Sequence, residues 1–402
     1  MRHASWPTVQ LEEVCEHITV GHVGPMVNEY IESGVPFLRS QNVRPFRFDP
    51  TELKFIAPAF HAKLKKSALR PMDVVVTRSG ANTGQCCIIP PHLTDANCSD
   101  LVIIRPSERI DPWYLMYVLN SDWGRATIAG GVVGAAQHHF NIGVARIFPV
   151  QLPPLPVQRR IAGILSAYDE LMENSQRRIR LLEAMARALY REWFVHFRFP
   201  GHDMKSSASG KSPDCASGML GGLCDLTKDT YDDAEHSELP LLDLAHIPSR
   251  TLAPQDTGKP SELTTSRIVF QKGDTLFGAI RCYLHKVVAA HYSGVTNTSV
   301  LVLRPKKPCF RSLLAIIASD AETIRWAETQ STGTKMPVIN WGIFQKMPAP
   351  VPSEAVAREF EKVAGPLLDQ IGVHANQIQN LRRTRDLLLP RLLSREVNLK
   401  EN

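Results

Sequence analysis

The sequence predicts an α+β protein in which two similar α+β domains are separated by two long antiparallel helices. Three observations predict this class: self-similarity with a period of about 199 residues, short β-type runs early in each copy, and a helical hydrophobic period late in each copy. The expected boundaries are 1–152 for the first domain, 153–200 for the first helix, 201–216 for a flexible linker, 217–352 for the second domain and 353–402 for the second helix.

The repeat keeps one offset through the later part of each copy. Arg105-Pro106 matches Arg304-Pro305, and Phe140-Asn-Ile-Gly143 matches Ile339-Asn-Trp-Gly342. Upstream the offset drifts slightly, as small loop differences would make it. A repeat that preserves order over so many positions predicts one structural unit used twice.

Each domain contains short apolar runs punctuated by Gly, Pro and Asn, which is typical of strands joined by turns. A helical stretch near 112–120 completes the α+β pattern of the first copy. The expected strands are Val74–Thr77, Cys86–Ile89 and Leu101–Arg105 in the first copy, and Thr275–Ile280, Lys286–Ala290 and Val300–Arg304 in the second.

The period becomes helical after Pro153-Pro154-Leu155-Pro156. Apolar residues recur at alternating steps of four and three from Ile161 to Trp193, and the same register continues from Phe360 to Leu392, which predicts two coiled-coil helices. Gly365-Pro366 predicts that the second helix breaks into a short piece and a longer one. Ser175 and His374 occupy equivalent positions and should face each other, either as a tolerated polar pair or as a register-setting contact.

Composition narrows the class of protein. The 402 residues carry a net charge of +6, which is compatible with a nucleic-acid partner but does not require one. Apolar stretches fall far short of the roughly 20 residues that span a bilayer, and the first residues lack a secretory pattern, so a cytoplasmic location is expected. The eight cysteines form no Cys-x-x-Cys pair, which favours reduced, buried thiols over a metal site.

Catalytic signatures are missing from the sequence. It has no complete phosphate-binding loop, no strand-linked Gly-x-Gly-x-x-Gly, no Asn-Pro-Pro-Tyr, no Gly-x-Ser-x-Gly and no His-Glu-x-x-His. Ser212-Pro-Asp214 resembles the start of a nuclease motif but lies in the expected linker. The chain is therefore expected not to be an enzyme by itself.

Several motifs, in their order and doubled, carry a resemblance to a known family. They are Trp6–Val14, Val35–Val43, Leu69–Gly80, Asn141–Gly143, Phe148–Ala162 and Ile179–Leu182. The chain resembles the specificity subunit of type I restriction-modification systems. The resemblance implies a DNA-binding subunit without catalysis that selects a bipartite, asymmetric target for two methyltransferase subunits and for restriction subunits. S-adenosylmethionine, ATP and Mg²⁺ would be cofactors of those partners and not of this chain.

Candidate DNA contacts lie where polar clusters interrupt apolar runs, because Arg, Asn and Gln match base edges in the major groove. Each of these side chains could instead be a solvated or capping residue. His138-His139 has no further metal ligand at suitable spacing, so no metal is expected. The candidates are Arg39, Gln41, Asn42, Arg78, Ser79, Asn82, Gln137 and His138 in the first copy, and Arg281, Tyr283, Asn297 and Lys335 in the second.

The two helices supply a second set of candidate residues, for helix pairing and for contact with partner subunits. Their arginines could be a solvated face or a docking surface for methyltransferase subunits, to which exposed Trp193, Phe194 and Phe197 would contribute. The candidates for helix pairing or partner contact are Ile161, Leu165, Ile179, Leu182, Leu189, Trp193, Phe194, Ile378, Leu381 and Leu388.

Two other functions remain open from the sequence. A structural adaptor with two protein-binding domains on a coiled-coil arm would show the same periodicity. A DNA nuclease with an unrecognised active site is the other alternative. Salt-sensitive DNA binding would argue against the adaptor, and Mg²⁺-dependent cleavage by the isolated chain would reveal the nuclease.

Overall fold

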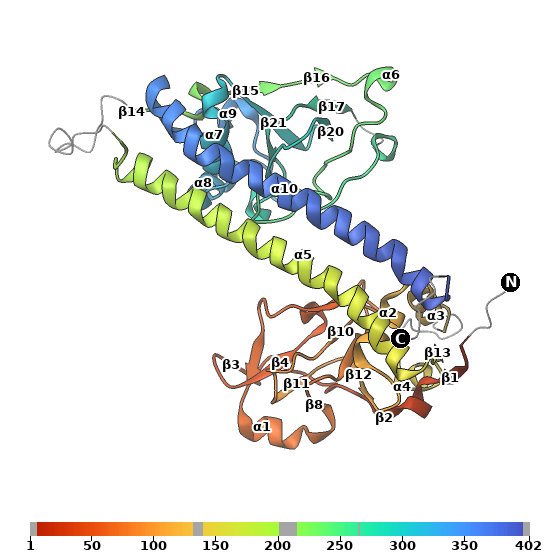
Figure 1. Cartoon of the computed structure of the whole chain (residues 1–402). Helices are drawn as coiled ribbons and strands as arrows, with labels where there is room; N and C mark the ends of the chain where they lie inside the picture. The colour runs from red at the N-terminus through yellow and green to blue at the C-terminus, as the bar shows by residue number, and fades with distance from the viewer. Residues whose placement is uncertain (1–5, 132–139, 201–214, 264–265, 397–402) are drawn as a thin grey trace. The chain divides into compact units, whose positions relative to one another are not determined.

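The computed structural model describes residues 6–131, 140–200, 215–263 and 266–396 (Figure 1). The chain divides into two compact units, of which unit 1 comprises residues 1–170 and 382–402 and unit 2 comprises residues 171–381. Each unit contains one α+β domain together with a segment of each long helix. Most of the expected linker, residues 201–214, lies outside the described residues.

A four-stranded antiparallel sheet forms the central layer of the unit 1 domain, and both of its faces are buried. Val74 and Val76 contact one hydrophobic cluster, which includes helix α2, whereas Val75 contacts a second cluster on the other face. Burial on both faces explains why these strands are continuous apolar runs rather than alternating ones. In spatial order the strands are β10 (Cys86–Ile88), β9 (Val74–Thr77), β12 (Leu101–Pro106) and β2 (Cys15–Val20).

A second sheet of five strands covers one face of this layer, and its β4 and β11 run parallel. Two small ribbons complete the domain: β1 (Thr8–Gln10) with β13 (Pro149–Gln151), and β5 (Val43–Arg44) with β6 (Arg47–Phe48). The five strands are β3 (Tyr30–Ile31), β7 (Lys54–Ile56), β4 (Val35–Leu38), β11 (Ala96–Cys98) and β8 (Ala68–Leu69).

Helix α2 (Pro112–Asn120) packs on the opposite face of the central sheet. Its start combines Pro112 in the first turn with the Asp111 carboxylate, which accepts a hydrogen bond from the backbone N–H of Tyr114 at 3.0 Å. Seven of its nine residues are buried, which matches a sequence that is apolar up to Asn120. The other helices of the domain are α1 (Pro58–Lys63), α3 (Asp122–Gly131) and α4 (Ile142–Arg146).

Unit 2 repeats this plan. Its central sheet is also antiparallel and buried on both faces, with Leu276 in one hydrophobic cluster and Phe277 in the other. Helix α7 (Arg311–Ala318) covers the face on which Phe277 lies. The strands, in the order that matches unit 1 from β2 to β10, are β15 (Cys224–Thr227), β21 (Val300–Pro305), β18 (Thr275–Gly278) and β19 (Val287–Ala289).

The outer sheet of unit 2 is smaller, with the three strands β16 (Asp229–Thr230), β17 (Arg267–Phe270) and β20 (Gly294–Asn297).

A separate two-stranded ribbon also repeats. Strand β14 (Cys215–Met219) pairs with β22 (Pro348–Pro352), as β1 pairs with β13 in unit 1. This pairing draws Cys215 and Ala216 into the domain, although the sequence placed them in the linker. The remaining elements are α6 (Asp233–His236), α8 (Ala321–Gln330) and α9 (Trp341–Phe344).

Helices α5 (Leu155–Tyr190) and α10 (Glu354–Leu393) pack against each other within each unit. In unit 2 the Trp193 ring, in the π-helical turn Arg191–Val195 after α5, lies 5.5 Å from that of Phe360. Ser175 lies further from the end of α5 and contacts Gln377, so the two segments run antiparallel. In unit 1, Asp169 pairs with Arg385.

The expected break at Gly365-Pro366 is wrong, because α10 is one helix of 40 residues. Pro366 and Lys362, whose carbonyl lacks the N–H donor that Pro366 cannot supply, are both exposed residues, so the missing hydrogen bond lies on the exposed side of the helix. Ala364 and Leu368 on the opposite side are buried in the core of unit 2 and hold the helix in place. Pro390 is exposed in the same way and does not end the helix.

Candidate nucleic-acid interface

Each unit contains its own buried ion pair, at an equivalent position just before strand β9 in unit 1 and just before β18 in unit 2. Arg105 donates two hydrogen bonds of 2.8 Å to Asp73, whose side chain is 1% exposed. In unit 2, Arg304 donates bonds of 2.9 and 2.8 Å to Asp274, which is 2% exposed. Each pair joins the same two neighbouring strands in its unit, β9 with β12 and β18 with β21, so the loops at the opposite end of β9 and β18 start from equivalent positions.

The unit 1 hairpin loop, residues 78–85, joins β9 to β10. Its backbone turns through Gly80 and Gly84, which have φ of +84° and +83°, values that glycine adopts without strain. Arg78 and Ser79 both bond to the carboxylate of Asp100, at 3.2 and 2.6 Å. Asn82 accepts a 3.2 Å hydrogen bond from Gln85. Three candidates, Arg78, Ser79 and Asn82, therefore lie together on this loop.

The unit 2 hairpin loop, residues 279–286, joins β18 to β19 and contains a 3₁₀ turn over Cys282–Leu284. Arg281, Tyr283 and Leu284 are exposed, whereas Cys282 is buried. His285 contacts the Ser319 carbonyl through Nε2 at 2.8 Å, and burial lowers the pKa of its imidazole. The loop thus presents one cationic and two bulky side chains to solvent.

A second segment lies beside each hairpin. The Phe140 N–H donates to the Arg78 carbonyl at 3.0 Å in unit 1, and the Ile339 N–H donates to the Ala279 carbonyl at 3.0 Å in unit 2. In unit 2 the Arg281 N–H also donates to the Pro337 carbonyl at 2.8 Å. This brings the segment that carries exposed Lys335 and Met336 next to Arg281. The corresponding candidates in unit 1, Gln137 and His138, lie outside the described residues.

The repeated Asn-x-Gly motif has a structural role at this place. Asn141 caps α4 by accepting a 3.0 Å hydrogen bond from the Val144 N–H, and Asn340 caps α9 in the same way with Ile343. Caps of this kind satisfy backbone donors that a helix start leaves unpaired. The motif therefore anchors the segment beside each hairpin.

The Arg39–Asn42 cluster lies elsewhere in unit 1. Its Asn42 side chain is buried, so the prediction that Asn42 contacts a base is wrong. Asn42 is fully buried, accepts from the Arg39 N–H at 3.0 Å and donates to the carbonyls of Asp49 and Thr51. Both the amide N–H donors and the carbonyl oxygen of this side chain are thus engaged in holding a loop. Arg39 donates to the Glu52 carbonyl at 2.7 Å and Gln41 donates to the Glu52 carboxylate at 3.1 Å.

Asn297 is also engaged within the fold. Its carbonyl oxygen accepts hydrogen bonds from the backbone N–H and the hydroxyl of Ser299. The Ser299 carbonyl in turn accepts from Ala279 at 2.9 Å, at the start of the unit 2 hairpin loop. Asn297 is therefore linked through Ser299 to the start of the hairpin loop and is not part of the loop itself.

The helix candidates lie mostly inside the protein. Trp193 and Phe194 are 6% and 5% exposed and pack on Phe360, so the expectation that they form an exposed docking surface is wrong. Phe197 is half-buried. The buried candidates are Ile161, Leu165, Ile179, Trp193, Phe194 and Ile378, and the half-buried ones are Leu182, Leu189, Leu381 and Leu388.

No direct hydrogen bond between Ser175 and His374 is found among the described residues. Both bond to the side-chain oxygen of Gln377, each at 3.3 Å, and both are buried in unit 2. Gln377 therefore links them, and the sequence pattern did not single out this residue.

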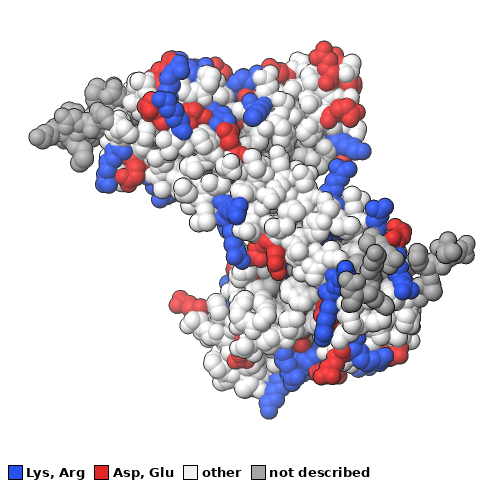
Figure 2. All heavy atoms as spheres, in the orientation of Figure 1, with Lys and Arg blue, Asp and Glu red and all other residues white. Residues whose placement is uncertain are grey.

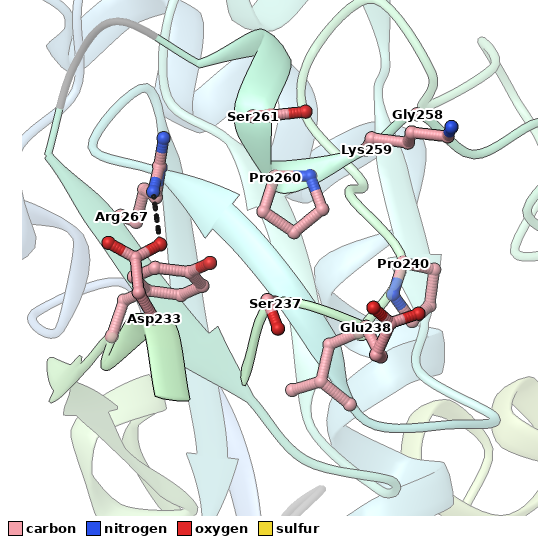
Figure 3. Close-up of a pocket in the computed structure, with 11 residues that line it drawn as sticks. Asp233, Ser237, Glu238, Pro240, Gly258, Lys259, Pro260, Ser261 and Arg267 are labelled. Carbon is pink, nitrogen blue, oxygen red and sulfur yellow. Dashed lines mark hydrogen bonds and ion pairs between the residues drawn. The ribbon is translucent and has the colours of Figure 1, made fainter. Parts of the chain in front are cut away.

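Basic and acidic side chains are interspersed on the face that Figure 2 shows, over both units. A hollow of about 560 Å³ in unit 2 illustrates this mixture, because Glu238 and Lys259 both line it. Arg267 lies over the Tyr231 ring and pairs with Asp233 at 3.2 Å (Figure 3). The positive charge of Arg267 is thus already compensated by the Asp233 carboxylate.

Metal and membrane features are not found in the described part of the chain. Within the described ranges, no group of three or more His, Cys, Asp or Glu side chains is arranged around a possible metal ion. None of the helices described here is both long and apolar enough to span a bilayer. The eight cysteines carry free thiols, seven of them buried, and burial raises the pKa of Cys215 to about 11.

The repeated arrangement of strands and helices, with different side chains on equivalent loops, defines a duplicated α+β protein. No family model matches the chain. The chain is 20% identical over 424 residues to the type I restriction enzyme MjaIX specificity subunit of Methanocaldococcus jannaschii, an alignment that covers 98% of this chain and 94% of the relative. It spans about half the length of the MjaX and MjaVIII specificity subunits of the same organism, at 24% and 23% identity.

The fold matches a solved specificity subunit as well. The crystal structure of a type I restriction-modification system S subunit from M. genitalium aligns with a TM-score of 0.57 and 15% identity, over 98% of this chain and 97% of that one. The chain is therefore a relative of type I restriction enzyme specificity subunits. This relationship confirms the resemblance seen in the motifs and agrees with the expectation that the chain is not an enzyme by itself.

Proposed function

We propose that this chain is the DNA-specificity subunit of a cytoplasmic type I restriction-modification complex and that it selects a bipartite, asymmetric target. Each α+β domain reads one half of the target through its hairpin loop and the segment beside it. The catalytic steps belong to other subunits. Two methyltransferase subunits bind S-adenosylmethionine and methylate adenine, and restriction subunits use ATP and Mg²⁺.

The observation that carries this proposal is a set of structural contacts that repeats in both units, while the exposed residues on the loops differ. The ion pairs Asp73–Arg105 and Asp274–Arg304 and the caps Asn141 and Asn340 repeat closely. The hairpin loops that they support carry different side chains. Two similar frames suit the repeating backbone of a duplex, and different side chains suit two different base sequences.

The interspersed surface charge also favours a specific DNA contact. Phosphate contacts are sequence-independent and need many cations, whereas base reading needs a few well-placed donors and acceptors. Arg281 and Lys335 are exposed on the unit 2 loops, beside Tyr283. These residues, with Arg78, Ser79 and Asn82 of unit 1, are the base and phosphate contacts of this proposal.

The long helices act as ruler and assembly platform in this proposal. A continuous α10 is better suited to setting a fixed distance than a broken helix would be. Exposed apolar side chains on the unit 2 segments, rather than Trp193 and Phe194, are the methyltransferase contacts. Those residues are Leu171, Leu181, Met185, Val363 and Val373.

Coexpression with an adenine methyltransferase encoded beside this chain tests the function. The methylated adenines of the host genome are mapped, and a bipartite motif with a fixed unspecified gap is expected. A stable complex that methylates nothing would favour the adaptor function. Mg²⁺-dependent cleavage of DNA by the isolated chain would favour the nuclease.

A pair of variants tests the platform. Leu181→Glu with Met185→Glu places two charges on the exposed apolar stripe and should abolish copurification of the methyltransferase. Ala184→Glu adds a charge at a neighbouring exposed helix position and should not. Equal copurification by all three proteins would contradict the assigned surface.

A further inference from the structure

Two residues in the unit 2 hairpin adopt a conformation that their side chains disfavour. Arg281 has φ of 53° and ψ of 59°, and His285 has φ of 54° and ψ of 52°, on either side of the turn Cys282–Leu284. In this left-handed region the Cβ of an L-residue crowds the following carbonyl oxygen. Non-glycine residues persist there only when the surroundings impose the conformation, and such positions cluster at functional sites.

The unit 1 hairpin has positive φ at the same two positions. Counting from the repeated aspartates, Gly80 corresponds to Arg281 and Gly84 to His285, and both glycines also have positive φ. The closing hydrogen bonds correspond as well. The Thr77 N–H donates to the Gln85 carbonyl, as the Gly278 N–H donates to that of Lys286, each at 2.8 Å. One loop conformation is thus built with glycines in unit 1 and without them in unit 2.

The two strained residues differ in what their side chains do. His285 is half-buried and contacts the Ser319 carbonyl, so it has a structural role in the fold. The Arg281 backbone is fixed by its bond to Pro337, but its side chain is exposed. Within the described residues, no hydrogen bond or ion pair of the Arg281 guanidinium is found. Its contacts inside the domain therefore do not explain why arginine occupies a glycine position.

The neighbourhood of Arg281 is a contact surface. Tyr283 and Leu284 on the same turn are 47% and 39% exposed, and Met336 on the adjacent segment is 51% exposed. Lys335 adds a second exposed cation beside them. Apolar side chains around two cations fit the edge of a base pair better than they fit bulk water, because thymine methyl groups and guanine acceptors lie in the same groove.

We propose that Arg281 is the specificity-determining residue of unit 2 and reads a guanine in its half of the target. This inference rests on the proposed DNA-recognition function. A guanidinium donates two parallel hydrogen bonds to O6 and N7 of guanine, a pattern that no other base presents in the major groove. In unit 1 the same point of the loop carries only the Gly80 backbone, so that half of the target is read by neighbouring side chains.

Genome-wide mapping of methylated adenines in the complete complex tests this inference. Arg281→Gly introduces the residue that unit 1 uses and relieves the strain, so the complex should assemble as before. One G·C pair in one half of the motif should become degenerate, with preference for it reduced about tenfold or more. The other half and the gap should stay unchanged. Arg358→Ala, which removes an exposed cation from α10 in the same unit, should leave the whole motif intact.

Two further variants separate base reading from structural effects. Arg281→Lys keeps the charge and the left-handed backbone but loses the two-pronged donor, so it should relax the same position. If the Arg281→Gly complex does not assemble, this variant tests on its own whether Arg281 reads the base. Gly80→Arg places a guanidinium at the open equivalent site, where an added Cβ meets nothing within 4 Å beyond the two adjoining residues, and should change the other half of the motif.

The outcomes distinguish this inference from the function on which it rests. A wild-type complex without any bipartite motif overturns both. A wild-type bipartite motif that Arg281→Gly and Arg281→Lys leave unchanged overturns only the role of Arg281. Relaxation of both halves together would also contradict it, because it would show that the variant weakens binding generally.

Discussion

Arg105 and Asp73 form a two-pronged ion pair in the interior of unit 1, with both hydrogen bonds at 2.8 Å. Arg304 and Asp274 repeat it in unit 2. Each aspartate also accepts a 2.8 Å bond from a backbone N–H three residues earlier, at Arg70 or Gln271. The pair therefore joins the turn before the second central strand to the strand beside it.

Removing the cation from this pair should be costly. Arg105→Ala leaves the Asp73 carboxylate buried without its partner, and we expect the free energy of unfolding to fall by about 3–5 kcal/mol. Urea unfolding of the full-length chain, or of its complex, measures this difference. Arg358→Ala breaks an exposed pair with Glu354 and should leave the free energy of unfolding almost unchanged. Equal losses in the two variants would contradict the structural role of Arg105.

Much of this frame could be predicted from the sequence because it depends on local patterns. The repeat in the sequence aligns Arg105 with Arg304, the two arginines of the ion pairs. The buried strands and the two helical registers followed from hydrophobic periodicity. The relationship to specificity subunits followed from the order of the motifs.

The functional residues were harder to predict, because polar residues in loops have several roles. Asn42 looks like a base-reading residue in the sequence, yet it is buried and holds a turn. The left-handed backbone at Arg281 leaves no local sequence signal, although the alignment with Gly80 could have revealed it. Asp100, which holds Arg78 and Ser79, comes from a distant strand end and could only be found in three dimensions.

Glu183 should anchor the unit 2 domain to α5. Its carboxylate is 2% exposed and accepts hydrogen bonds from the Thr251 hydroxyl at 2.6 Å and the Leu252 N–H at 2.7 Å. Glu183→Ala leaves these donors unpaired, so we expect unit 2 to lose about 2–3 kcal/mol of stability. Glu173→Ala, at an exposed position of the same helix, is the control. Limited proteolysis and urea unfolding would show no difference between the variants if Glu183 were dispensable.

His291 should make stability depend on pH. The ring packs on α10 where an added Cβ at Gly372 would lie 2.3 Å from its Cγ, and its Nε2 is buried without a hydrogen-bond partner. Burial lowers the pKa of His291 to about 4, from 6.5, while Asp369 opposes this shift and Arg311 and Lys272 add to it. The unfolded chain therefore takes up a proton that the folded chain excludes.

The sign of the effect follows from this lowered pKa. Stability is fully present above pH 6.5 and is lost as the pH falls from 6.5 towards 4, by roughly 3 kcal/mol if the whole shift is expressed. His291→Gln removes the titrating group, so the wild-type chain should lose more stability than the variant over this range. Thermal unfolding from pH 7 to pH 4 measures the difference. Parallel pH profiles would show that His291 is not the group responsible.

The length of the helices should set the gap in the DNA target. Deleting residues 171–177 from α5 together with 375–381 from α10 removes one heptad from each helix and preserves the buried register. The helices then shorten by about 10 Å, at 1.5 Å per residue, which corresponds to about three base pairs of duplex. We expect the mapped motif to keep both halves and to lose about three positions from its gap. Deleting only 171–173 shifts the register of one helix and should abolish methylation at the original motif. A shortened pair that still prefers the original gap would show that the helices do not act as the ruler.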